Sequence, residues 1–203
     1  MDSAYSQQPT KRDGAMVSWG IFSWTKSKGR QVMISKIRAD LDELLAAEGR
    51  SRSRANILWA IFGWDAFLIL ATFRVRQAAH SMHIPLVGRI IRGLQMILWG
   101  IELGRDIQLG AGVYFVHSVG TVVGGTSKVG KGTRLYGCNT IGTVSDNGCP
   151  VIGDRVSIGA GARVLGPVTV GAQAKIGANA VVMTDVPSEQ TAVGIPAKIV
   201  SKS

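Results

Sequence analysis

The chain has 203 residues, of which 46% are hydrophobic, and a formal net charge of +10. This length suits one or two globular units, and the two cysteines, Cys138 and Cys149, match neither a disulfide framework nor a zinc knuckle in their spacing. A basic chain can bind nucleic acid, anionic lipid or an anionic ligand. The sequence carries no recognised nucleic-acid motif, so we expect no nucleic-acid partner. The scarcity of cysteine favours a reducing, cytoplasmic location.

The N-terminal part of the chain predicts a tail followed by a helical region. Residues 1–30 lack the apolar core of a signal peptide and are expected to form a disordered tail. Residues 31–48 place aliphatic side chains at helical spacing, and Gly49 follows them as a stop signal. We therefore predict a first helix there and a helical region over residues 31–99.

An apolar run over residues 57–73 is flanked by arginines on both sides. It is short for a membrane-spanning helix and carries Asp65 near its centre, so a helix buried in a bundle or at an oligomer interface is the favoured interpretation. Peripheral contact with a membrane surface stays open as an alternative, because Trp59 and Trp64 suit such an interface. A last helix is predicted over residues 87–99, beyond a proline that disfavours helix before it.

From residue 100 onward, a six-residue repeat dominates the sequence. Such repeats are typical of a parallel β-helix, in which three short strands form one triangular coil of about eighteen residues and the repeated aliphatic side chain points inward. A β-sandwich would instead show irregular turn spacing. We predict a mainly β domain over residues 100–203, including a C-terminal tail. The repeated positions are Leu103, Leu109, Phe115, Val123, Val129, Leu135, Ile141, Ile152, Ile158, Val164, Val170, Ile176 and Val182.

Two breaks interrupt this repeat. The register slips by two residues between Phe115 and Val123, and the segment Thr143–Pro150 has the composition of a turn. We predict that Thr143–Pro150 forms a loop outside the prism. Irregularity inside a repeat often marks a functional site.

His117 lies inside the first break, fifteen residues after Glu102. With eighteen residues per coil, residue 120 would stack over Glu102, so the two side chains are expected near one corner. A carboxylate can orient one imidazole nitrogen and leave the other to accept a proton. The spacing alone is equally consistent with the alternative interpretation, a solvated histidine beside a surface glutamate without a catalytic role. A zinc enzyme of the γ-class carbonic anhydrase type would need three histidines, and the coils hold one, so we expect no metal.

Four segments closely resemble the serine acetyltransferase family of hexapeptide-repeat acyltransferases: residues 100–105, 114–124, 158–167 and 192–200. The resemblance implies a left-handed parallel β-helix behind a helical N-terminal region. It also implies acetyl-CoA as co-substrate, bound in a groove between neighbouring prisms of a homotrimer, or of a dimer of trimers.

Carried over by position, His117 falls on the general base of that family and Glu102 on its aspartate partner. The positions that line the acetyl-CoA groove are Gly142, Ala160, Ala178 and Lys198. Cys138 is expected to pack inside a coil.

The resemblance fails at the acceptor side of the site. Val116 replaces an aspartate, and Gly148-Cys149 replaces an arginine–histidine pair; Asn147 belongs to the same acceptor-facing set. A lost arginine–carboxylate contact costs roughly 1.5–3 kcal/mol. We therefore expect free serine to bind poorly, and a sugar hydroxyl of exopolysaccharide or envelope glycan to be the acceptor. The alternatives are a serine O-acetyltransferase of cysteine biosynthesis and a non-catalytic trimeric scaffold.

Overall fold

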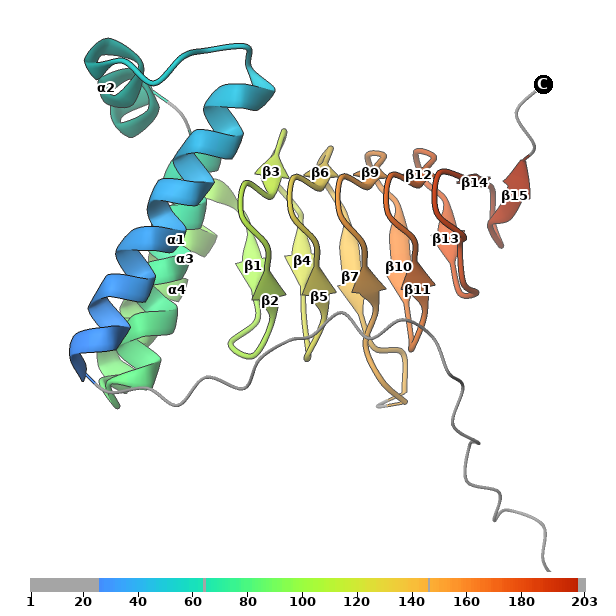
Figure 1. The fold of residues 1–203 in the computed structure, drawn as a ribbon. Helices are drawn as coiled ribbons and strands as arrows, with labels where there is room; N and C mark the ends of the chain where they lie inside the picture. The colour runs from blue at the N-terminus through green and yellow to red at the C-terminus, as the bar shows by residue number, and fades with distance from the viewer. Residues whose placement is uncertain (1–25, 64, 146, 201–203) are drawn as a thin grey trace, which may run out of the picture.

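The computed structural model describes residues 26–63, 65–145 and 147–200. Within these ranges, helices gather at one end of a long triangular prism of short strands (Figure 1). The helices are α1 (Lys26–Ala47), α2 (Arg54–Gly63), α3 (Asp65–Ser81) and α4 (Pro85–Trp99). The strands are β1 (Glu102–Leu103), β2 (Gln108–Leu109), β3 (Tyr114–Phe115), β4 (Val122–Val123), β5 (Lys128–Val129), β6 (Arg134–Leu135), β7 (Thr140–Gly142), β8 (Val151–Ile152), β9 (Ser157–Ile158), β10 (Arg163–Leu165), β11 (Thr169–Val170), β12 (Lys175–Ile176), β13 (Val181–Val182), β14 (Thr191–Val193) and β15 (Lys198–Val200).

The predicted parallel β-helix is confirmed. Three sheets form the faces of the prism, in the strand orders β1-β4-β7-β10-β13, β11-β8-β5-β2 and β15-β14-β12-β9-β6-β3. Every described strand pair is parallel except β14 with β15. All thirteen aliphatic and aromatic repeat positions point inward, and none is more than 7% exposed. The six-residue repeat therefore marks the core of the prism, which each coil completes by stacking on the next.

The coils are not all of equal length. Val122 pairs with Thr140 and Arg163 with Val181, as eighteen-residue coils require. Glu102 pairs with Val122, however, so the first coil holds twenty residues, and the expectation that residue 120 stacks over Glu102 is wrong. The two extra residues widen the corner over residues 116–121, where the register slips. The second predicted irregularity is confirmed, because Thr143–Pro150 joins β7 to β8 as a loop.

The helical region differs from the sequence-based expectation at two places. Helix α1 begins at Lys26, so residues 26–30 are helical; the rest of the predicted tail, residues 1–25, lies outside the described residues. The apolar run 57–73 is divided between α2 and α3 rather than forming one helix. No single described helix is long and apolar enough to cross a bilayer, although the bent pair α2–α3 has the required length and composition together.

Helix α3 closes the N-terminal end of the prism. In the prism, the N–H groups of one coil donate to the carbonyls of the next, as from Gly104 N to Val123 O at 2.7 Å. The first coil has no coil before it, so its own carbonyls need other donors. Arg74 donates to Leu109 O and Gly110 O, each at 2.9 Å, and Arg76 donates to Leu103 O and Gly104 O at 2.7 and 2.8 Å. Two arginines of α3 thus replace the missing strand donors.

These two arginines differ in their charge partners. Arg74 is 2% exposed and forms a two-bond ion pair with the fully buried Asp40 of α1, at 2.9 and 3.0 Å. Arg76 is 6% exposed, and its other partner is the neutral amide oxygen of Gln95, at 3.1 Å. Only Arg74 therefore has a buried counter-ion.

Candidate active site

One edge of the prism carries His117. This His117 edge consists of the four corners at residues 116–121, 136–139, 159–162 and 177–180, each of which leads into a strand of the β1-containing sheet. Backbone hydrogen bonds stack the corners on one another: Cys138 N donates to Val119 O at 3.0 Å, Gly161 N to Gly137 O at 2.9 Å, and Asn179 N to Ala160 O at 2.8 Å. His117 is exposed at the widened corner, so a ligand along this edge can reach its imidazole.

Backbone contacts bring Glu102 to the same corner. Gly120 N donates to Gly100 O, and Glu102 N donates to Thr121 O, both at 2.9 Å. The side chain of Glu102 is nevertheless turned to α4, where its carboxylate forms an ion pair with Arg92. Both groups of this pair are partly exposed, at 52% for Arg92 and 40% for Glu102. No hydrogen bond joins Glu102 to His117 in the described part of the chain.

Gly137 lies directly over His117 in the next coil. Its φ of +103° is in the region that favours glycine. A Cβ at this position would lie 2.9 Å from His117 Cβ and 3.2 Å from the backbone oxygen of His117. The absence of a side chain at residue 137 therefore leaves the space that His117 occupies.

Arg163 extends from β10 to the same edge. It takes the outward position of the column Glu102, Val122, Thr140, Arg163, and its Nη1 donates to the backbone oxygen of Cys138. Cys138 is exposed with a φ of +51°, so the expectation that it packs inside a coil is wrong. A guanidinium therefore stands at the corner stacked on the His117 corner.

The expected acetyl-CoA positions fall on two edges. Ala160 and Ala178 are exposed on the His117 edge, two and three corners beyond His117. Lys198 pairs with Val193, whose side chain lies against the corner at Gly177. Gly142 lies instead at the end of β7, on a different edge.

That other edge carries most of the acceptor-facing set. We call it the loop edge; it consists of the corners at residues 104–107, 124–127, 142–150 and 165–168. Asn147 Oδ1 accepts from Thr143 Oγ1 at 3.4 Å, and Cys149 Sγ accepts from Thr126 N at 3.3 Å. Val116 adjoins His117 on the His117 edge. One chain therefore does not bring the candidate acceptor residues together.

At Gly148, the position where the family carries arginine, the loop adopts a backbone conformation that disfavours a side chain. Gly148 has a φ of +118°, and a Cβ there would lie 3.0 Å from Pro167 Cβ. A side chain at residue 148 would strain the backbone and crowd Pro167. The departure from the family pattern is therefore built into the loop conformation.

Sequence reasoning did not find the partners of these residues. Arg92 approaches Glu102 from a helix outside the repeat, so no periodicity points to it. Arg163 occupies an outward position of the repeat, and the register of the coils could have aligned it with Glu102. Among the described residues, no group of three or more His, Cys, Asp or Glu side chains is placed to hold a metal ion.

Comparison with known proteins agrees with this architecture. Residues 149–183 match the family described as bacterial transferase hexapeptide (six repeats), and residues 93–115 match the hexapeptide repeat of succinyl-transferase. The serine acetyltransferase of Helicobacter pylori strain 26695 is 35% identical over 165 residues, covering 80% of this chain and 95% of that protein.

Two solved structures are similar over most of the chain. The Neisseria gonorrhoeae serine acetyltransferase in complex with serine has a TM-score of 0.73 and 26% identity, covering 86% of this chain and 72% of that one. The soybean serine acetyltransferase complexed with serine has a TM-score of 0.72 and 30% identity, covering 83% and 69%.

Fold, repeats and relatives together define a hexapeptide-repeat acyltransferase. More narrowly, the chain belongs to the serine acetyltransferase family. The expectation of a sugar or glycan acceptor is wrong, because the relatives that match are serine acetyltransferases. The alternative of a non-catalytic scaffold gives way to an enzyme for the same reason.

Proposed function

We propose that the protein transfers the acetyl group of acetyl-CoA to the hydroxyl of L-serine. The proposal is carried by the placement of Glu102 and His117 at one corner of the prism, in a chain that covers 95% of a bacterial serine acetyltransferase. The Neisseria and soybean neighbours were each solved with serine, which supports the same acceptor.

In this mechanism, His117 accepts the hydroxyl proton of serine while the hydroxyl oxygen attacks the thioester carbonyl. Imidazole titrates near neutral pH, which suits a general base. The tetrahedral intermediate then collapses, the carbon–sulfur bond breaks, and the imidazolium returns the proton to the leaving thiolate of CoA. The products are O-acetylserine and CoA. Placing both substrates along one edge supplies the proximity that the reaction needs.

Glu102 acts by orienting His117. Its carboxylate pairs with Arg92, so it has to turn from α4 toward the imidazole, or share its two oxygens between Arg92 and His117. Both side chains are partly exposed, which leaves room for that rotation. A carboxylate on one imidazole nitrogen fixes the tautomer in which the other nitrogen accepts the proton.

A homotrimer would complete the site. Val116 and His117 lie on the His117 edge, whereas Asn147 and Cys149 lie on the loop edge. If the His117 edge of one protomer faces the loop edge of the next, the two halves of the acceptor site meet. Helix α4 also exposes large apolar side chains beside the prism, with Ile97 at 81% and Leu98 at 63%. Exposed apolar surface of this kind is typical of an interface.

Acetyl-CoA would then lie along the His117 edge. Its thioester would reach His117, its pantetheine would pass the small residues Ala160 and Ala178, and its phosphates would approach Lys198. Methyl side chains leave the backbone accessible, and an ammonium group suits a phosphate. Gly142 of the neighbouring protomer would border the same groove.

Arg163 is our candidate for holding the carboxylate of serine. The family position of an arginine is occupied by Gly148, which has no side chain to offer. Arg163 Nη1 reaches the backbone oxygen of Cys138 at the corner stacked on that of His117, and a backbone oxygen is a partner that a carboxylate can replace.

The test is CoA release from acetyl-CoA with L-serine, L-alanine and ethanolamine as acceptors. Alanine lacks the hydroxyl, and ethanolamine lacks the carboxylate. We expect turnover with serine, none with alanine and a much higher KM with ethanolamine. Equal turnover with serine and ethanolamine would refute the carboxylate contact, and no turnover with serine would refute the proposed function.

A further inference from the structure

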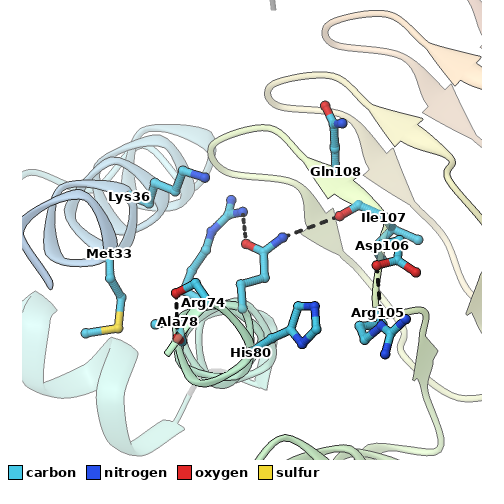
Figure 2. A pocket seen from close by; sticks show the side chains of 11 residues that line it. Met33, Lys36, Arg74, Ala78, His80, Arg105, Asp106, Ile107 and Gln108 are labelled. Atoms are coloured by element: carbon cyan, nitrogen blue, oxygen red, sulfur yellow. Dashed lines mark hydrogen bonds and ion pairs between the residues drawn. The ribbon is translucent and has the colours of Figure 1, made fainter. Parts of the chain in front are cut away.

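Two cavities lie where α3 and α4 meet the first coil, at the 104–107 corner of the loop edge. The larger cavity, which we call the junction cavity, has a volume of about 510 Å³, within the range of small-molecule sites. A smaller one of about 290 Å³ adjoins it and shares Gln77, His80, Arg105 and Asp106 (Figure 2). The residues lining the junction cavity include Arg76, His80, Arg89, Arg92, Arg105 and Asp106.

Positive charge dominates its wall. Four arginines line the cavity, against a single carboxylate, Asp106. Asp106 pairs with Arg105 at 3.4 Å, and Figure 2 shows both side chains opposite His80 of α3. Arg89 forms no hydrogen bond or ion pair with any residue that the structure describes. The cavity therefore holds cationic groups in excess of their anionic partners.

The most informative of these groups is Arg76, because it is buried. Its partners within the described residues are neutral: the side chain of Gln95 and two backbone oxygens of the first coil. Burial, and then the positive charge of Arg92, lower its pKa to about 10, so it remains a cation at neutral pH. A buried charge is costly without a counter-ion.

Arg74, in the same helix, is a buried arginine that does have a counter-ion. It lies two residues before Arg76, caps carbonyls of the same first coil, and has Asp40 as its counter-ion. Arg76 has no equivalent of Asp40, but it borders a cavity. An anion in that cavity would take the place that Asp40 takes beside Arg74.

We propose that the junction cavity binds a small oxyanion of the phosphate class, either free phosphate or the phosphoryl group of a metabolite. Arg89 and Arg105 are exposed and can each donate two parallel hydrogen bonds to a phosphoryl group, which is the geometry that guanidinium groups favour. Arg76, which also lines the cavity, contributes its buried positive charge.

Anion binding in the junction cavity would also affect the catalytic corner, through Arg92 and Glu102. Arg92 lines the cavity and holds the carboxylate of Glu102. An anion that attracts Arg92 would weaken this pair and release Glu102 toward His117. This consequence rests on the proposed function, whereas anion binding itself does not.

Isothermal titration of the full chain with inorganic phosphate, at an ionic strength held constant with chloride, tests the binding. We expect one saturable site per chain. Arg89→Gln and Arg105→Gln should each weaken binding about tenfold or more, because each removes a charge-assisted contact. Arg38→Gln is the matched control: Arg38 is exposed on α1 and lines neither cavity, so its loss should leave the affinity unchanged.

Heat that never saturates, or equal loss of affinity in all three variants, would overturn the proposal. Repeating the titration with saturating CoA separates the sources of the phosphoryl group. If saturating CoA leaves the phosphate affinity of the wild type unchanged, the site is assigned to an independent anion. If CoA competes with phosphate in the wild type but not in Arg89→Gln, the site is assigned to the phosphates of CoA.

Turnover measurements then test the coupling alone. Phosphate should change kcat in the wild-type enzyme and have no effect in Arg92→Gln. If phosphate binds but kcat is identical with and without it, the coupling is refuted while the binding site stands. If the enzyme shows no serine turnover at all, the proposed function fails and the titration still decides the site.

Discussion

Replacing Arg74 with methionine should destabilise the protein strongly. Arg74 is 2% exposed and makes two bonds to Asp40 and two to carbonyls of the first coil, all within 3.0 Å. The variant keeps Asp40 buried, with Gly112 N as its remaining donor at 3.0 Å. Breaking a buried ion pair on one side costs about 3–5 kcal/mol. For a chain of this length, that corresponds to a fall in Tm of roughly 6–20 °C.

Thermal unfolding followed by circular dichroism measures this effect, and Arg52→Met is the control. Arg52 also contacts both oxygens of one carboxylate, that of Asp42, at 3.0 Å, but the two side chains are 49% and 48% exposed. An exposed pair contributes about 0–1 kcal/mol. A Tm loss in Arg74→Met no larger than that in Arg52→Met would refute the idea that α3 caps the prism through a buried ion pair.

Three further predictions concern the catalytic corner and are read from steady-state kinetics. Glu102→Gln should lower kcat about 10²-fold, because misplacement of the base by about 1 Å has that effect; an unchanged kcat would remove Glu102 from the mechanism. Arg163→Gln should raise the KM for serine about 10- to 150-fold, the value of one charge-assisted contact, and an unchanged KM would exclude the carboxylate contact. Gly137→Ala should lower kcat because its Cβ would lie 2.9 Å from that of His117, whereas Gly132→Ala, at a φ of +64° and with 3.5 Å of clearance, should retain activity. Equal activity of the two alanine variants would contradict this reading.

The repeat could be predicted because one physical requirement recurs at every sixth position. Each inward side chain has to fill the same narrow interior, so Val123, Leu135 and Ile158 appear in step and are fully buried. The loop Thr143–Pro150 was predictable for the converse reason, since its polar and turn-forming residues cannot fill that interior.

The slip of two residues between Phe115 and Val123 already implies a first coil of twenty residues, and the expectation that residue 120 stacks over Glu102 overlooked it. The register of β1 with β4 confirms that the slip lies in the corner of His117, the one corner between Phe115 and Val123. The spacing of Glu102 and His117 still brought them to one corner, where Gly120 N donates to Gly100 O and Glu102 N donates to Thr121 O.

The contacts of Arg74 and Arg76 could not be predicted from the sequence. Arg74 pairs with Asp40 across 34 residues, and Arg76 reaches carbonyls of the first coil 27 and 28 residues away. Contacts between a helix and a β-helix follow neither a six-residue nor a helical period. The cavity beside Arg76 therefore emerged from the structure alone.

The measurement that tests the account most directly is the release of CoA from acetyl-CoA by the purified chain with L-serine, compared between the wild type and His117→Ala. We predict serine-dependent release in the wild type and a loss of about 10²- to 10⁴-fold in the variant, the range that a general base contributes. Serine-dependent release that is equal in His117→Ala, or absent from a folded wild-type protein, would contradict the account.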